Sequence, residues 1–153
     1  MTMNDAVSLP PQPDQPEDAP VPLADEFMAR AGRRELAVAR CRRTGTALSY
    51  AAHRRPGEVQ WQTAGGRARL HSFTVLWQAY RAEAKLPYNV AWVELDEGPR
   101  LISTVAVADV RDLRIGMPLR ARFEPGGRLV FDPDSAAFDA DPAAFDARPP
   151  VER

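Results

Sequence analysis

The basic residues of this chain are almost all of one type, and several lie beside its single cysteine. Nineteen of the 20 basic residues are arginine, and Lys85 is the one lysine. Arginines precede and follow Cys41 in the run Arg40-Cys41-Arg42-Arg43. Guanidinium groups form paired hydrogen bonds with phosphate and carboxylate oxygens, so this segment is suited to an anionic ligand. A bias in amino-acid composition is the alternative explanation for the excess of arginine.

Residues suited to catalysis are scarce. The chain has no Gly-x-Ser-x-Gly motif, no phosphate-binding loop and no His-Glu-x-x-His motif. Its two histidines, His53 and His71, fall in different elements, and a pair of either with Cys41 lacks an oxyanion site and a third partner. The acidic residues at 94–97 are typical of a solvated hairpin tip. The sequence therefore predicts that the chain is not an enzyme and that His71 is a structural residue.

The net charge of the 153-residue chain, −1, averages three unlike segments. Residues 1–25 carry −5, residues 26–132 carry +7, and residues 133–153 carry −3. The basic body can hold an anionic ligand, and the acidic ends disfavour indiscriminate binding of polyanions. No run of 18 apolar residues and no secretory leader are present, so we expect a cytoplasmic protein without a membrane span. One cysteine excludes an intramolecular disulfide.

The distribution of proline and apolar residues divides the chain into four segments. Residues 1–22 hold six of the 15 prolines and predict a disordered acidic arm. At 23–34, Leu23, Phe27 and Ala31 recur at helical spacing, which predicts a short helix. Weaker strand signals follow at 36–40 and 46–51, and residues 53–66 are expected to form a loop anchored by Trp61. We expect residues 23–65 to form one subdomain, 66–132 a barrel and 133–153 an acidic tail.

Alternation of apolar and polar residues begins at residue 67. It predicts strands at 69–77, 89–95, 100–107, 118–124 and 128–132, a hairpin turn at 96–99 and one helical turn at 109–113. In the first strand it places His71, Phe73 and Val75 on one face and Leu70 on the other. The pattern predicts a mainly β protein: a five-stranded OB-like barrel after a short helix, with disordered tails. A β-sandwich is the alternative.

The C-terminal tail contains a tandem repeat. Residues 136–142 read AAFDADP and residues 143–149 read AAFDARP. Because each copy ends in proline and holds one large apolar residue, a coiled coil is excluded. Phe138 and Phe145 are typical of a short docking element, and disorder without a partner is the alternative.

Two motifs of the barrel region, found in order, resemble the DUF35 family. They are VAWVELDEGPRLISTVAV at 90–107 and DLRIGMP at 112–118. The Ser72-Phe73-Thr74 segment and Pro87-Tyr88 also match the family pattern, and the likeness covers residues 23–132. It implies a rubredoxin-like zinc ribbon followed by an OB-fold.

The ribbon segment departs from the family pattern. A Cys-x-x-Cys-Gly knuckle is usual, but residues 41–45 read Cys-Arg-Arg-Thr-Gly, so Thr44 replaces the second cysteine. The second cysteine pair is absent as well. A closed zinc site needs four ligands, and Cys41 and His53 supply at most two. We therefore expect a degenerate ribbon without zinc, with Cys41 as a small buried residue.

The resemblance implies a role in acyl-CoA chemistry. DUF35 proteins accompany lipid-transfer-type thiolases, related condensing or retro-aldol enzymes, or MaoC-type enoyl-CoA hydratases. We expect a non-catalytic accessory subunit with a thiolase-like or, alternatively, a hydratase-like partner, and with acyl-CoA as a candidate ligand. The candidate contacts with CoA phosphates are Arg40, Arg42, Arg43, Arg54 and Arg55. The candidate partner-binding residues are Trp77, Tyr80, Tyr88, Phe138 and Phe145.

Two other interpretations remain open. Each candidate arginine can equally be a solvated surface residue. An OB-fold can also bind single-stranded nucleic acid, through aromatic residues near Arg81 and Lys85. The acidic ends of the chain disfavour that second function.

Metal analysis of the purified protein tests the expected loss of zinc. We expect far less than one zinc per chain, because one cysteine and one nearby histidine cannot complete a tetrahedral site. Stoichiometric zinc that survives dialysis against a chelator would overturn the prediction.

Overall fold

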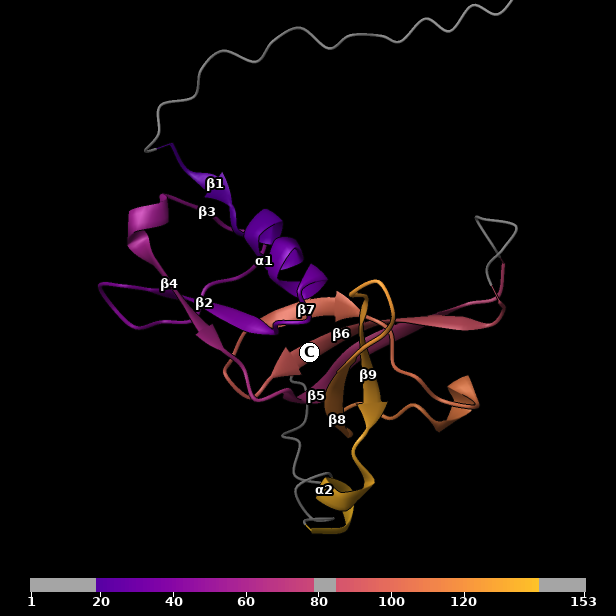
Figure 1. Ribbon diagram of the computed structural model, residues 1–153. Helices are drawn as coiled ribbons and strands as arrows, with labels where there is room; N and C mark the ends of the chain where they lie inside the picture. The colour runs from indigo at the N-terminus through magenta and orange to yellow at the C-terminus, as the bar shows by residue number, and fades with distance from the viewer. Residues whose placement is uncertain (1–18, 79–84, 141–153) are drawn as a thin grey trace, which may run out of the picture.

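The computed structural model describes residues 19–78 and 85–140, and the elements follow the order β1 to α2 (Figure 1). Within these residues the chain is mainly β, as the alternation predicts. Its largest sheet has five antiparallel strands in the order β7-β6-β5-β8-β9. Their bounds are Arg67–Leu76 for β5, Tyr88–Leu95 for β6, Arg100–Ser103 for β7, Pro118–Phe123 for β8 and Leu129–Pro133 for β9.

The sheet closes on itself just beyond β7. Val105 forms a parallel bridge with Phe131 of β9. The Phe131 amide donates to the carbonyl oxygen of Thr104 at 3.0 Å, and its own carbonyl accepts from the Ala106 amide at 2.8 Å. Asn89 fixes the same segment, because its side chain exchanges two hydrogen bonds of 2.8 Å with the Val105 backbone. This closure and strand order make the predicted OB-type barrel.

The barrel interior is filled by the inward positions of its strands. In β6 every second residue is buried, from Asn89 to Leu95, and Trp92 and Glu94 face outward as expected. The η2 turn (Val110–Asp112) lies between β7 and β8, and the Asp109 side chain accepts from the Arg111 amide as its cap. Both features match the sequence prediction. Buried and outward residues alternate in β6 because one face of an antiparallel strand packs on the core.

The predicted faces of β5 are wrong at one point. The register with β6 shifts between Leu70 and Ser72, so His71 is an extra residue in a β-bulge. Leu70 and Phe73 therefore lie on the same side, opposite Val93 and Ala91 of β6, although the uninterrupted alternation placed them on opposite faces. A bulge adds one residue to one strand and reverses the faces beyond it.

A smaller part of the structure precedes the barrel. It consists of α1 (Leu23–Gly32), the two-stranded sheet of β2 (Ala37–Cys41) with β4 (Val59–Thr63), and the short pair β1 (Val21–Pro22) with β3 (His53–Arg54). The single turn η1 (Pro56–Glu58) leads into β4. Leu23, Phe27 and Ala31 form the buried face of α1, which confirms the predicted helix.

Four local predictions for this part and the tails are wrong. Residues 53–66 are not a loop, because β4 pairs with all of β2, and residues 46–51 form only one bridge, Arg40 to Ala47. The N-terminal segment predicted to be disordered through residue 22 ends in a paired strand, β1. The tail predicted from residue 133 begins with the last residue of β9 and with α2 (Ser135–Ala140). Residues 1–18 and 141–153 lie outside the described part.

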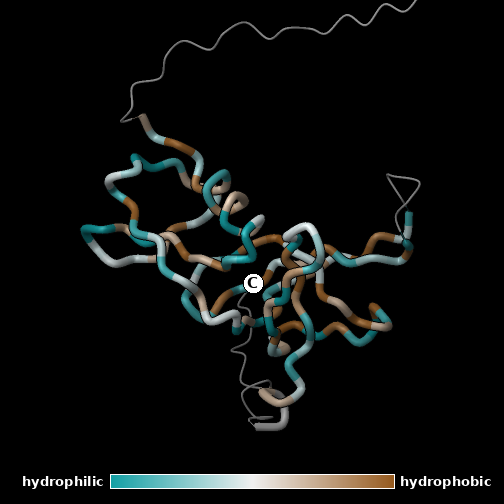
Figure 2. Tube along the Cα trace, viewed as in Figure 1, coloured by the Kyte–Doolittle hydropathy of each residue, from teal (hydrophilic) through white to brown (hydrophobic). Residues whose placement is uncertain are grey.

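One apolar core joins the helix and β2 to the barrel. Phe27 of α1 and Tyr50 contact each other with ring centroids 4.3 Å apart, and both belong to the cluster that fills the barrel. Val38 of β2 faces this cluster, and Ala39 faces a second one with Leu23. Figure 2 shows hydrophobic and hydrophilic residues alternating along the strands, whereas the loop after β2 is mostly hydrophilic.

One hydrogen bond fixes Tyr50 within the smaller part, and another links that part to the barrel. The Tyr50 hydroxyl donates to the carbonyl oxygen of Ala37 at 2.9 Å, and burial raises the pKa of this phenol well above its ordinary value. At the β6–β7 turn, the Glu97 carboxylate accepts from the Gly65 amide at 2.7 Å. Glu97 thus ties the turn to the segment that enters the barrel, so the prediction of a purely solvated tip is wrong for this residue.

Phe27→Ala tests the shared core. It should lower the free energy of unfolding by about 3 kcal/mol, because a buried ring is lost and a cavity remains. Met28→Ala on the same helix is the control, since that side chain is 66% exposed and its loss should change stability by less than about 0.5 kcal/mol. Urea unfolding followed by circular dichroism measures both. Equal effects of the two substitutions would contradict the shared core.

Candidate functional site

Residues 41–45, where the resemblance implies a degenerate zinc knuckle, form a tight turn at the end of β2. The Gly45 amide donates to the carbonyl oxygen of Cys41 at 2.8 Å, and the Cys41 amide donates to Thr46 at 2.9 Å. Gly45 has a φ of +71°, a conformation that side chains rarely adopt, so glycine is favoured here. The turn therefore holds its shape through backbone hydrogen bonds.

Thr44 takes over a role toward Cys41 that the sequence did not reveal. A hydrogen bond from the Thr44 hydroxyl, with further ones from the amides of Thr44 and Arg43, lowers the pKa of the Cys41 thiol. Cys41 is half-buried, not fully buried as expected. Across residues 19–78 and 85–140, no three His, Cys, Asp or Glu side chains come together as a metal site would require. From the sequence, Thr44 indicated only that the second cysteine of the knuckle is absent.

Three of the five candidate arginines line one hollow. Arg42 and Arg43 come from the turn after β2, and Arg54 comes from β3. The hollow has a volume of about 620 Å³. We call it the arginine hollow, and its lining is Cys41, Arg42, Arg43, Thr44, Thr46, Leu48, Arg54, Gly57 and Glu58.

The arginine hollow is positively charged. Among the described residues, no carboxylate forms an ion pair with Arg42, Arg43 or Arg54. Arg54 donates to the carbonyl oxygen of His53 at 2.8 Å, which leaves its charge uncompensated. Three guanidinium groups around one concavity are suited to an anion with several oxygens.

The other two candidate arginines do not line this hollow. The Arg40 Nε donates to Gln62 of β4 at 2.8 Å, and its terminal nitrogen donates to the carbonyl oxygen of Gly45 at 3.0 Å. Arg40 therefore stabilises the turn instead of facing a ligand. Arg55 caps η1, where its amide donates to the Glu58 carboxylate at 3.4 Å.

The β5–β6 hairpin extends beyond the barrel, as Figure 1 shows, on the side opposite the arginine hollow. We call its outer part, residues 76–78 and 85–88, the arm. Trp77 is 67% exposed and Leu86 is 43% exposed. Tyr88 pairs with Leu76 across the two strands and is half-buried. Exposed apolar side chains on a projecting hairpin are typical of a contact surface.

The remaining candidate residues do not form a site with the arm in the described part of the chain. Tyr80 and Phe145 lie outside the described residues, and Phe138 falls within α2. His53 lies in β3 opposite Pro22, and His71 is the bulge residue of β5, so the two histidines do not meet.

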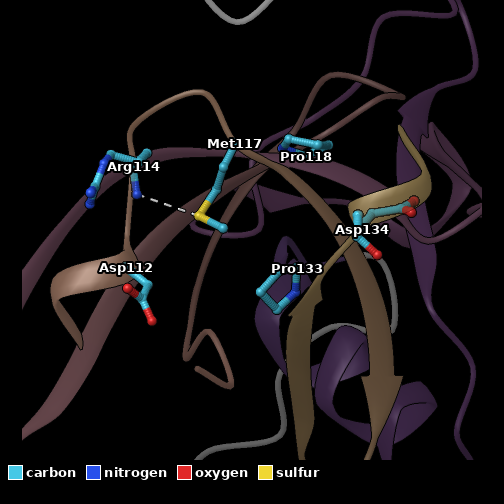
Figure 3. A pocket seen from close by; sticks show the side chains of 7 residues that line it. Asp112, Arg114, Met117, Pro118, Pro133 and Asp134 are labelled. Carbon is cyan, nitrogen blue, oxygen red and sulfur yellow. Dashed lines mark hydrogen bonds between the residues drawn. The ribbon is translucent and has the colours of Figure 1, made fainter. Parts of the chain in front are cut away.

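Two further hollows contain no candidate arginine. One, of about 320 Å³, lies between η2 and the end of β9 (Figure 3). There the Met117 sulfur accepts from the Arg114 amide at 3.5 Å, and Asp112 and Asp134 lie on either side. The other, of about 440 Å³, is an apolar groove between α1 and β7, and it shares no lining residue with the arginine hollow.

Thr44→Val tests the environment of the thiol. Loss of the hydroxyl donor should raise the pKa of Cys41, because the thiolate loses a hydrogen bond that favours it. The pH midpoint of the iodoacetamide reaction should then move to higher pH, and the signal reports one site because the chain has one cysteine. Thr46→Val, on the same hollow, should leave the midpoint in place. An unchanged midpoint in Thr44→Val would contradict this account.

Comparison with known proteins finds a family model and solved structures that resemble this chain. Residues 61–124 match the model for the C-terminal OB-fold domain of ChsH2. A chain of the solved structure described as an Ltp2-ChsH2(DUF35) aldolase is similar, with 23% sequence identity and a TM-score of 0.63. The likeness covers 80% of this chain and 98% of that one.

A second solved structure, a DUF35 protein of unknown function from Sulfolobus solfataricus, is also similar. It has 11% sequence identity and a TM-score of 0.54, over 74% of this chain and 86% of that one. No helix in the described part of our chain is long and apolar enough to cross a membrane. Residues 61–124 thus match an OB-fold domain of the ChsH2 C-terminal type, and the described chain shares the fold of two solved DUF35 structures.

Proposed function

We propose that this chain is a non-catalytic accessory subunit that binds a thiolase- or aldolase-type acyl-CoA enzyme. The observation that supports this most is the likeness to ChsH2, which spans nearly all of that chain. The name of that structure joins the DUF35 chain with Ltp2 and with aldolase activity. A partner enzyme of the same general kind is therefore the natural candidate for our chain.

The arm supplies a surface for such a partner. Trp77 and Leu86 expose large apolar side chains on the outer part of β5 and β6, where burial by a second protein would remove them from water. Aromatic side chains that become buried at the centre of an interface contribute most of the binding energy. The arm would insert these two residues into the enzyme surface.

The arginine hollow supplies a site for the ligand of the complex. Coenzyme A carries phosphates, and Arg42, Arg43 and Arg54 face one concavity without carboxylate partners in the described structure. These guanidinium groups would hold the phosphate end of the CoA moiety by charge-assisted hydrogen bonds. The chain would orient its ligand and cover the entrance of the enzyme's active site, while the bond-making groups belong to the enzyme.

The partner is tested by co-expression with a thiolase- or aldolase-type enzyme encoded beside this chain. The two proteins should co-elute in gel filtration at micromolar concentration. Trp77→Ser and Leu86→Ser should each weaken the complex at least about tenfold, as loss of an apolar anchor does. Met28→Ser is the control, because Met28 is as exposed as Trp77 but lies on α1.

Each alternative has its own outcome in this experiment. Separate elution from every neighbouring thiolase or aldolase would refute the proposal. Co-elution with a MaoC-type hydratase instead would establish that partner. Binding to a single-stranded oligonucleotide with a steep salt dependence would establish nucleic-acid binding.

A further inference from the structure

β7 is an edge strand of the five-stranded sheet. Over Arg100–Ser103 it pairs with β6 alone, and on its other side the first bridge to β9 forms at Val105, beyond the end of the strand. The Ser103 hydroxyl donates to the carbonyl oxygen of Leu129 at 2.9 Å, just before that bridge. The apolar groove between α1 and β7 is lined on its far side by the start of β9, so the barrel keeps an open seam there.

The backbone groups of Arg100 and Ile102 face this seam. The Leu95 amide donates to the carbonyl oxygen of Pro99 at 3.0 Å, which sets the phase of the β6–β7 ladder. Because hydrogen-bonded and non-hydrogen-bonded pairs alternate in an antiparallel ladder, Leu101 bonds to β6 and its two neighbours do not. Their N–H and C=O groups point away from β6, and such an edge recognises the backbone of an extended peptide.

The side chains around the seam are apolar. Ile102 is 61% exposed, Met28 of α1 is 66% exposed, and both line the groove. The buried Phe27 and Leu101 line it as well. On the outer face of the sheet, Trp92 of β6 lies opposite Ile102 and is 47% exposed. A strand added to β7 would therefore bury apolar side chains on both of its faces.

A close backbone contact holds α1 in place as a wall of the groove. A Cβ atom on Gly127 would lie 2.8 Å from both the carbonyl oxygen of Ala31 and the Cα of Gly32. Gly127 also has a φ of +80°, so glycine lets the β8–β9 turn approach α1 this closely. The groove is thus built into the fold, and a preformed groove lowers the ordering cost of binding.

Arg128 gives the groove a preference for an acidic ligand. It is the one charged residue among the described residues that line the groove, and its side chain is 65% exposed. Its guanidinium lies 3.9 Å from the Glu124 carboxylate and 3.4 Å from the Thr104 hydroxyl. These contacts leave donors for a further carboxylate, which would lie beside the C-terminal end of β7.

We propose that the seam between β7 and β9 binds an extended peptide segment of a partner protein, which pairs antiparallel with Arg100 and Ile102. Antiparallel pairs are the more stable kind, and they place the N-terminal end of the peptide beside Arg128. An acidic residue at that end and apolar residues at alternate positions complete the contact. The proposal does not rest on the proposed function, because the groove shares no residue with the arm or the arginine hollow.

The pairing is tested by NMR titration of the full chain with the synthetic peptide acetyl-DVTVTV-amide. The backbone amide signals of Arg100 and Ile102 should shift saturably. The Ile102 amide should also exchange with solvent more slowly in the complex, because it becomes a hydrogen-bond donor. The matched control is the same peptide methylated on every backbone nitrogen, which should not bind. No saturable shift at about 1 mM peptide, or equal shifts with the methylated peptide, would overturn the proposal.

Ile102→Pro tests the edge in the protein itself. Proline removes the N–H that faces the seam and spares the ladder with β6, so affinity for the peptide should fall at least about tenfold. Ile115→Ser is the control, because Ile115 is 42% exposed and does not line the groove. Unchanged affinity in a folded Ile102→Pro variant, or an equal loss in the control, would contradict the pairing.

The charge preference is tested with a second variant, which also decides the matter if Ile102→Pro does not fold. Arg128→Gln should weaken binding of acetyl-DVTVTV-amide about threefold, as loss of an exposed ion pair does. It should leave binding of acetyl-NVTVTV-amide unchanged. Equal affinity of wild type and Arg128→Gln for the acidic peptide would overturn the proposed orientation in the groove.

Discussion

The packing of Phe27 against Tyr50 in the shared core is the contact on which the rest of the structure depends. It joins α1 and β2 to the core that the five strands enclose. β2 is buried on both sides, with Val38 toward the barrel and Ala39 toward Leu23. In a zinc ribbon the metal holds such strands together, and unfolding without metal is common. Here burial of apolar side chains and the Tyr50 hydrogen bond to Ala37 perform that task.

This arrangement determines where the two proposed binding surfaces lie. Because β2 is fixed on the barrel, the turn that follows Cys41 projects away from it and meets Arg54 across the arginine hollow. On the other side, β5 and β6 continue past the barrel and expose Trp77. A cationic concavity at one end and an apolar arm at the other suit a protein that contacts a ligand and a partner through separate surfaces.

The sequence predicted the barrel well because inward and outward residues alternate in β6 and β8. It failed where pairing over long range decides the structure. β4 alternates between Val59, Trp61 and outward glutamines, but flanking prolines and glycines made it look like a loop. The bulge at His71 leaves no trace in the pattern, although it reverses the faces of β5. Arg42 and Arg43 are adjacent in sequence, whereas only the fold brings Arg54 to them.

Hydrogen exchange of the complex tests the central claim most directly, because it shows which surface the enzyme covers. The account predicts slower exchange in the complex than in the free chain for the peptides that contain residues 76–78 and 85–88, since the enzyme buries the arm. The peptide around Met28 should exchange equally in both states. A stable complex that leaves the arm peptides unchanged and protects the groove beside α1 instead would contradict the account.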